Sequence, residues 1–117
     1  MMTESLEIAE IIMSAISDKK GRDILLIEVS EKLPITDYFV LASGGSSIQV
    51  RAISDGVEMK MKESGILPLR IEGHREGRWI LLDYGDVVVH VFHEEEREFY
   101  GLERFWGDAP QKEYDEN

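Results

Sequence analysis

Residues 79–92 read Trp79-Ile-Leu-Leu-Asp-Tyr-Gly-Asp-Val-Val-Val-His-Val-Phe92, and this is the most apolar stretch of the chain. Two short apolar runs on either side of Tyr84-Gly85 are typical of a β-hairpin. From residue 87 to residue 91 the side chains on both faces of the predicted strand are apolar, apart from His90. The second hairpin strand is therefore predicted to lie inside a sheet, with a layer over each face.

Further helices and strands are predicted on both sides of the hairpin from the spacing of apolar residues. They are a helix over 3–20, strands over 23–29 and 38–42, a helix from 46 to 65, a strand over 67–73 and a helix over 93–105. Ser46 and Gln49 have the spacing of a capping box at the start of the second helix. Phe99, Leu102 and Trp106 form an apolar stripe on the last one.

These elements predict a single domain of the α/β class, in which helices and strands are mixed. The order is α-β-β-α-β-β-β-α, and it favours a mixed sheet of about five strands flanked by helices. The 117 residues, 43% of them hydrophobic, suit one core. The domain is predicted to span residues 1–110, and the acidic tail over 111–117 is expected to fray.

The charge and the residue types exclude several functions. Acidic residues number 24 and basic residues 13, so the net charge is −11. Direct binding to DNA is not expected, because such binding depends on Lys and Arg, and a basic partner is favoured instead. The absence of Cys excludes disulfides and thiolate metal sites. Neither a signal peptide nor a membrane span is apparent, so we expect a cytoplasmic protein.

The Gly44-Gly45-Ser46 turn, between a predicted strand and a predicted helix, is one candidate for catalytic chemistry. Such a turn can bind a phosphate, and it is also the ordinary form of a helix cap. No Lys follows it, and the next strand has no Asp-x-Asp pair for metal-dependent nucleotidyl transfer. The capping interpretation is therefore favoured, and no cofactor is expected.

Carboxylates and histidines near the hairpin are the other candidates. Asp83 and Asp86 flank the turn, where Asp commonly makes local hydrogen bonds. His90 and His93 precede three glutamates, but their spacing matches no zinc motif, and an acidic first turn is typical of a helix N-terminus. We therefore expect no metal site and no catalytic residue.

A protein-binding surface is the remaining possibility. Residues 93–117 contain nine acidic and three basic residues, and aromatic residues are dense from 79 to 106. Aromatic residues surrounded by acids are typical of an interface for a basic protein. The predicted partner-binding residues are Trp79, Asp83, Tyr84, Asp86, His90, Tyr100, Glu103 and Trp106.

Several motifs along the chain resemble the ribosomal silencing factor family, also called Iojap-like. They are the run from Thr36 to Gly44, the pair Glu72-Gly73, the hairpin stretch 79–92, and Glu98-Phe-Tyr-x-Leu-Glu-x-x-Trp-Gly-Asp-Ala109. The resemblance as a whole extends over nearly the whole chain.

This resemblance implies a nucleotidyltransferase-like fold without enzymatic activity. It also implies a translation repressor that binds a large-subunit ribosomal protein at the intersubunit face. The repressor would block association of the ribosomal subunits when nutrients are scarce. The acidic composition supplies a physical reason for such a partner, because ribosomal proteins are basic.

Two alternatives remain open from the sequence. One is a nucleotide-binding or nucleotidyltransferase-like enzyme that uses the Gly44-Gly45-Ser46 turn. The other, which is compatible with ribosome binding, is a homodimer whose interface covers the apolar surface.

Overall fold

The computed structural model describes residues 2–114. Its elements are α1 (Met2–Asp18), β1 (Arg22–Glu28), β2 (Tyr38–Gly44), α2 (Ser47–Glu63), β3 (Arg70–Glu72), β4 (Trp79–Asp83), β5 (Val87–His93), α3 (Glu94–Tyr100), α4 (Leu102–Phe105) and β6 (Gln111–Glu113). None of the helices in this range has both the length and the apolar character that a bilayer crossing requires.

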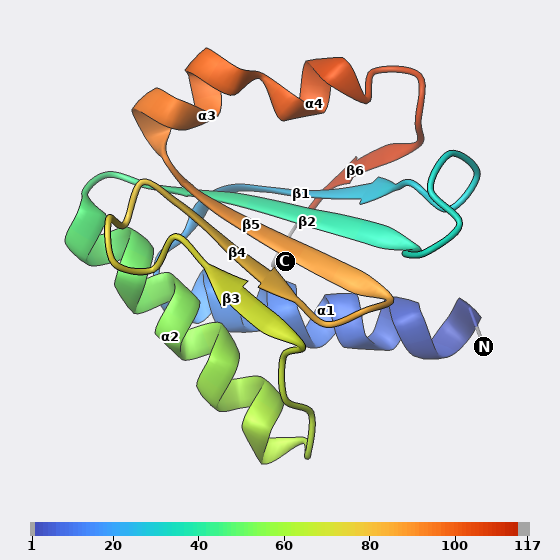
Figure 1. Ribbon diagram of the computed structural model, residues 1–117, viewed down its shortest axis with the longest axis horizontal. Coiled ribbons are helices and arrows are strands. Elements are labelled where there is room, and N and C mark those ends of the chain that lie inside the picture. The colour runs from blue at the N-terminus through green and yellow to red at the C-terminus, as the bar shows by residue number, and fades with distance from the viewer. Residues whose placement is uncertain (1, 115–117) are drawn as a thin grey trace.

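The strands form one mixed sheet in the order β3-β4-β5-β2-β1-β6. The two central strands, β2 and β5, are parallel, and the other neighbouring pairs are antiparallel. Helices α1 and α2 lie on one side of the sheet, and α3 and α4 lie on the other (Figure 1). The predicted single α+β domain with a mixed, helix-flanked sheet is confirmed, although the sheet has six strands where about five were expected.

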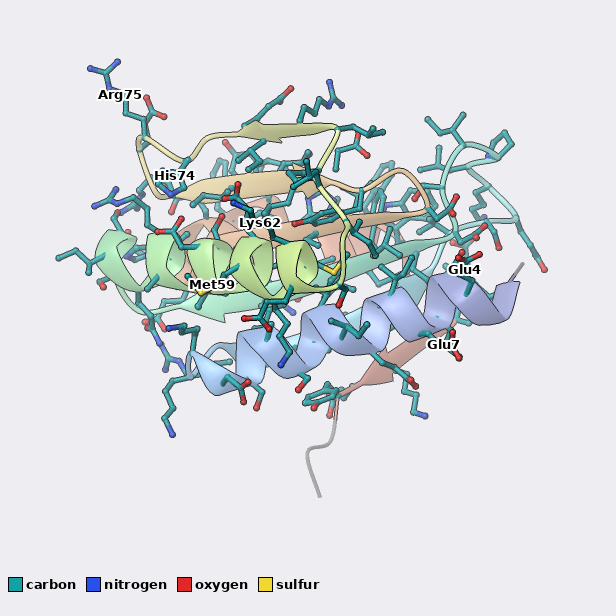
Figure 2. All side chains as sticks on the ribbon, turned by 90° about the horizontal axis from the view of Figure 1, so that it is seen from below. Glu4, Glu7, Met59, Lys62, His74 and Arg75 are labelled. Atoms are coloured by element: carbon teal, nitrogen blue, oxygen red, sulfur yellow. The ribbon has the colours of Figure 1, made fainter. Side chains whose placement is uncertain are left out.

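The larger hydrophobic cluster lies between the sheet and the α1–α2 layer, which Figure 2 shows in front of the strands. Val40, Ile80, Val89 and Val91 contribute to it and have no exposed surface. A smaller cluster, on the α3–α4 side, includes Ile27, Leu41, Phe92 and Trp106. The central strand β5 is therefore covered on both faces, as its continuous apolar run predicts.

The Ser46 cap predicted for α2 is present, and the reciprocal bond of the capping box is made one residue earlier, at Gly45. The Ser46 hydroxyl accepts a hydrogen bond from the backbone N–H of Gln49 at 3.1 Å, and the Gln49 side chain accepts one from the N–H of Gly45 at 2.7 Å. The helix stops before Gly65, which has a φ of 80°. Two backbone donors are thus satisfied by the cap itself.

The last helix, predicted to be continuous over 93–105, is in fact two helices, so this prediction is wrong. Gly101 adopts a left-handed conformation with a φ of 56°, and it divides the segment into α3 and α4. The expected apolar stripe is divided as well, because Leu102 and Trp106 pack in the smaller cluster while Phe99 is 79% exposed. Glycine adopts this conformation at little cost, so it commonly ends a helix.

The strands at the two edges of the sheet also differ from expectation. Strand β3 has three residues instead of the predicted seven, since Pro68 has no N–H to donate to a ladder. Strand β6 pairs with β1 at residues 111–113, so the fraying expected there is wrong. The same expectation for residues 115–117 lies outside the described residues.

Gly73 closes the β3–β4 connection in a conformation that a side chain would disturb. Its φ is 82°, and a Cβ atom would lie 2.1 Å from the carbonyl oxygen of Trp79. We expect Gly73→Ala to lower the free energy of unfolding by about 1–3 kcal/mol, because strain and backbone displacement add. Gly65→Ala is the matched control, since Gly65 has a φ of 80° with open space around it. Equal losses for the two variants in urea titrations would contradict the steric contribution.

Candidate functional site

One face of the sheet is left partly uncovered at strand β4. Successive side chains on a strand point to opposite faces, so Trp79, Leu81 and Asp83 share the α3–α4 side. All three are half-buried, whereas Ile80 and Leu82 on the other side are fully buried. Helices α3 and α4 cover the β1, β2 and β5 region instead (Figure 1). We call the α3–α4 side of β3 and β4 the open sheet face.

A row of aromatic rings crosses from α3 over the sheet to α4. Neighbouring ring centroids are between 4.7 and 6.0 Å apart. In order, the rings of this aromatic row belong to Phe99, Tyr100, Trp79, His90, Phe39, Trp106 and Phe105. The row is buried at its centre and exposed at its ends, where Phe99 and Phe105 have 79% and 78% of their surface in solvent.

His90 lies at the centre of this row and is buried. The Trp79 indole N–H donates a hydrogen bond to Nδ1 of His90 at 3.2 Å, so the proton of a neutral ring is on Nε2. Within the described residues Nε2 has no hydrogen-bond partner. Burial lowers the pKa of His90 to about 4, because the charged form would lose its hydration. His90 is thus a neutral core residue and is not exposed to a partner.

Asp83 and Asp86 frame the hairpin turn at the end of the open sheet face. Asp83 is in an ion pair with Arg70 at 3.3 Å and accepts a hydrogen bond from the N–H of Gly85. Asp86 is exposed, and its backbone carbonyl accepts hydrogen bonds from the N–H groups of residues 37 and 38. The Asp83 carboxylate therefore makes contacts within the turn, whereas the Asp86 side chain lies in solvent.

Tyr84 lies on the opposite side of the sheet from Trp79. It packs against the larger cluster beneath α1 and α2, and its hydroxyl has no partner among the described residues. Burial, with the nearby Glu58 carboxylate, raises the pKa of Tyr84 to about 12. Tyr84 thus does not share a surface with Trp79, although both were predicted for one patch.

The remaining predicted residues divide in the same way. Tyr100 is 52% exposed and its ring lies 4.8 Å from that of Trp79. Trp106 is only 8% exposed, so the interpretation of Trp106 as a surface anchor is wrong. Glu103 accepts hydrogen bonds from Arg97 at 3.1 and 3.2 Å and is half-buried. The structure therefore brings Trp79, Asp83 and Tyr100 to one face.

The sequence interpretation missed two aromatic side chains that are largely in solvent. Phe99 stands next to Tyr100 on α3, and Phe105 is the last residue of α4. Their exposure follows from the break at Gly101, which turns α4 away from the line of α3. Gly101 was the available signal, because glycine within a helical pattern often marks a helix end.

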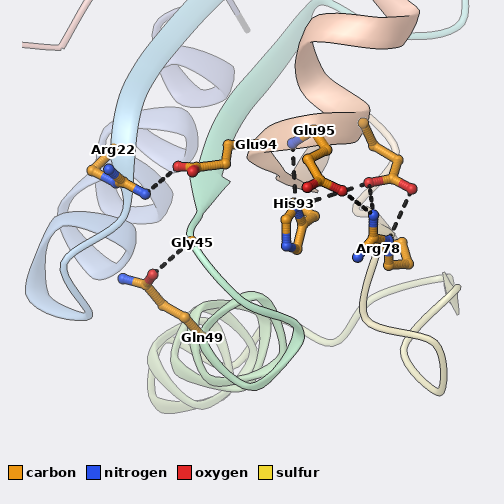
Figure 3. A network of polar contacts seen from close by, with 8 residues as sticks. Arg22, Gly45, Gln49, Arg78, His93, Glu94 and Glu95 are labelled. Atoms are coloured by element: carbon orange, nitrogen blue, oxygen red, sulfur yellow. Dashed lines mark hydrogen bonds and ion pairs between the residues drawn. The ribbon is translucent and has the colours of Figure 1, made fainter.

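The Gly44-Gly45-Ser46 turn lies where the parallel strand β2 ends and α2 begins (Figure 3). The N–H of Gly45 donates to the Gln49 side chain, and the Ser46 hydroxyl accepts from the N–H of Gln49. Arg22 lies beside the turn, within 3.0 Å of where a Cβ of Gly45 would be, and it forms an ion pair with Glu94. A phosphate bound here would have to displace these contacts.

Three potential metal ligands meet at the start of α3. Side-chain atoms of His93, Glu95 and Glu96 lie within 4.8 Å of one another. Arg78 donates hydrogen bonds to both carboxylates at 2.9 Å (Figure 3), and these bonds hold the pKa of Glu95 below its usual value. His93 itself caps α3 by accepting from the N–H of Glu95. The guanidinium thus already pairs with both carboxylates that a divalent cation would need.

The comparisons with known proteins agree with this architecture. The family model described as "Ribosomal silencing factor during starvation" matches residues 2–117. The ribosomal silencing factor RsfS of Bacillus subtilis is 44% identical over 108 residues, which is 92% of each chain. A crystal structure from Chromobacterium violaceum has a TM-score of 0.85 at 38% identity, over 87% of this chain and 85% of that one. A mouse relative, "Mitochondrial assembly of ribosomal large subunit protein 1", is 31% identical over 83% of this chain and 44% of its own length.

The fold and the site define a small α+β domain that presents aromatic and acidic side chains on a partly uncovered sheet face. Such a face is typical of protein-binding domains. The family match and the identity to RsfS then settle the membership: the chain belongs to the ribosomal silencing factor family. Members are ribosome-associated regulators of translation.

Proposed function

We propose that this protein is a non-enzymatic repressor of translation that acts in the cytoplasm. It binds a basic protein of the large ribosomal subunit at the intersubunit face and prevents the small subunit from joining, above all under nutrient limitation. The family description mentions starvation, and the mouse relative is named for assembly of the large subunit. The first supports a role under nutrient limitation, and the second supports a large-subunit partner for this chain.

The observation that carries the proposal is the open sheet face with its exposed aromatic residues. Phe99 and Tyr100 project from α3 beside half-buried Trp79, and aromatic residues of this kind are frequent centres of protein interfaces. Asp83 and Asp86 stand at the end of the same face. With a net charge of −11, the protein attracts a basic surface and is repelled by RNA phosphates.

Repression follows from size alone. The described residues form a body of 35 × 33 × 31 Å. Two surfaces that make direct contacts approach to within a few ångström, so a bound body of this thickness holds them apart. This mechanism needs no reaction and no conformational change.

The test compares two exposed residues on opposite layers of the molecule. We expect Tyr100→Ala to weaken binding to purified large subunits by about 1–4 kcal/mol, about 5- to 1000-fold, because an aromatic anchor is lost. Ile48→Ala is the matched control, since Ile48 is 75% exposed on α2. Binding is measured by co-sedimentation, and subunit joining by the yield of whole ribosomes on a sucrose gradient.

The results separate the two parts of the proposal. Wild-type protein that fails to bind large subunits, or that binds them without lowering the yield of whole ribosomes, would contradict the proposed function. Tyr100→Ala that binds and represses like Ile48→Ala would remove the α3 end of the open sheet face from the interface.

A further inference from the structure

A cavity of about 600 Å³ lies at the β6 edge of the sheet, whereas the open sheet face lies at the β3 edge. This volume is within the range of about 300–1000 Å³ that small-molecule sites have. Strands β1 and β6, the C-terminal end of α1 and the α3–α4 segment all contribute to its walls. The charged lining residues are Asp23, Arg97, Glu103 and Glu113.

An irregularity in β1 shapes this cavity. Arg22 pairs with Ser43, but Leu25 pairs with Leu41, so β1 has one residue more than β2 between these pairs. Asp23, in the bulge, has a positive φ of 52°. Bulges redirect side chains and are frequent beside functional sites, and a non-glycine residue in this conformation is uncommon. The bulge places Asp23 in the cavity wall.

Arg97 supplies a buried cation to the same cavity. Its side chain is 10% exposed; Nε donates to both carboxylate oxygens of Glu103, and Nη1 donates to the hydroxyl of Ser43 at 2.8 Å. Within residues 2–114, Nη2 makes no hydrogen bond. A guanidinium nitrogen that is held in place by two neighbours, with donors to spare, suits a carboxylate oxygen of a ligand.

Two unpaired carboxylates add negative charge to the lining of the cavity. Asp23 and Glu113 are exposed and form no ion pair with another described residue. The Glu103 carboxylate is already paired with Arg97. The cavity therefore offers one cation with an unused donor and two anions without a partner, together with the side chains of Gln111 and Tyr114.

We propose that this cavity binds a small dipolar molecule of the free α-amino acid class. The ligand's carboxylate accepts from Nη2 of Arg97, and its ammonium group lies against Asp23 and Glu113. A simple anion would be repelled by the two unpaired carboxylates, and a simple amine would leave the Arg97 donor unused. Only a ligand with both charges satisfies both sides of the cavity.

The matched probes are L-glutamine, 4-aminobutanamide, which lacks its carboxylate, and 4-carbamoylbutanoate, which lacks its ammonium group. We expect L-glutamine to raise the melting temperature saturably and to shift backbone amide signals in β6, with each single-charge probe at least about tenfold weaker. Asp23→Asn and Glu113→Gln should each weaken L-glutamine binding. Asn tolerates the positive φ at position 23, so the bulge is retained.

Glu31→Gln is the matched control, because Glu31 is exposed and lies outside the cavity. No saturable response to L-glutamine would overturn the proposal, and so would equal binding of the amine or of the carboxylate alone. Unchanged binding in a folded Asp23→Asn/Glu113→Gln double variant would overturn it as well.

Discussion

Replacing Trp106 with Ala should lower the free energy of unfolding by about 3–5 kcal/mol. Trp106 is 8% exposed, packs with Ile27, Leu41 and Phe92 in the smaller cluster, and its ring lies 5.6 Å from that of Phe39. Truncation leaves a cavity under α4 that the surrounding strands cannot fill. Urea unfolding followed by the fluorescence of Trp79, the other tryptophan, measures the change.

The neighbouring residue is the control for this prediction. Phe105 is 78% exposed, so Phe105→Ala should change the stability by no more than about 0.5 kcal/mol. The two substituted residues are adjacent in the sequence, but Trp106 is buried and Phe105 is largely exposed. Similar stabilities would show that Trp106 is not a core residue and would restore it as a candidate surface anchor.

The stability of the protein should fall by roughly 3 kcal/mol between pH 6.5 and pH 4 through His90 alone. The pKa of the buried ring is lowered to about 4, while in the unfolded chain it is near 6.5. Below pH 6.5 the unfolded chain therefore binds a proton at His90, whereas the buried ring of the folded protein stays unprotonated until the pH nears 4. The stabilising contribution of His90 is complete above pH 6.5 and is lost as the pH falls. Below pH 4 it does not change further.

The control for this pH dependence is His90→Asn, whose side-chain oxygen can accept from the Trp79 indole but does not titrate. The carboxylates of the protein also titrate over this range, so the informative quantity is the difference between the two stability curves. We expect that difference to shrink by roughly 3 kcal/mol on acidification. Parallel curves would show that His90 titrates normally in the folded protein.

Much of the fold could be predicted because its central strands carry strong local patterns. The apolar run from Val87 to Val91 and the capping residues Ser46 and Gln49 each specify their own structure. Strand β6 could not be found in this way. Its three residues are polar and exposed, and it is held by main-chain pairing with β1, which leaves no trace in the side chains.

The site was predicted less well, because sequence alone does not give exposure. Trp106 and Phe105 are adjacent aromatics with opposite environments, and only the position of α4 decides between them. The alternation of side chains along β4 was a signal in the sequence that the prediction did not use. Trp79 and Tyr84 are five positions apart, an odd step, so a regular extended chain directs them to opposite faces.

The parallel pairing of β2 with β5 has a consequence for how the chain folds. Tyr38 pairs with Val87, and α2, β3 and β4 all lie between them in the chain. Pairs so distant in sequence require a long loop to close first, and this slows folding. Leu25 in β1, next to the edge strand, pairs with Glu113, which is still more distant in sequence. A growing polypeptide thus cannot complete its sheet until residue 113 has been synthesised.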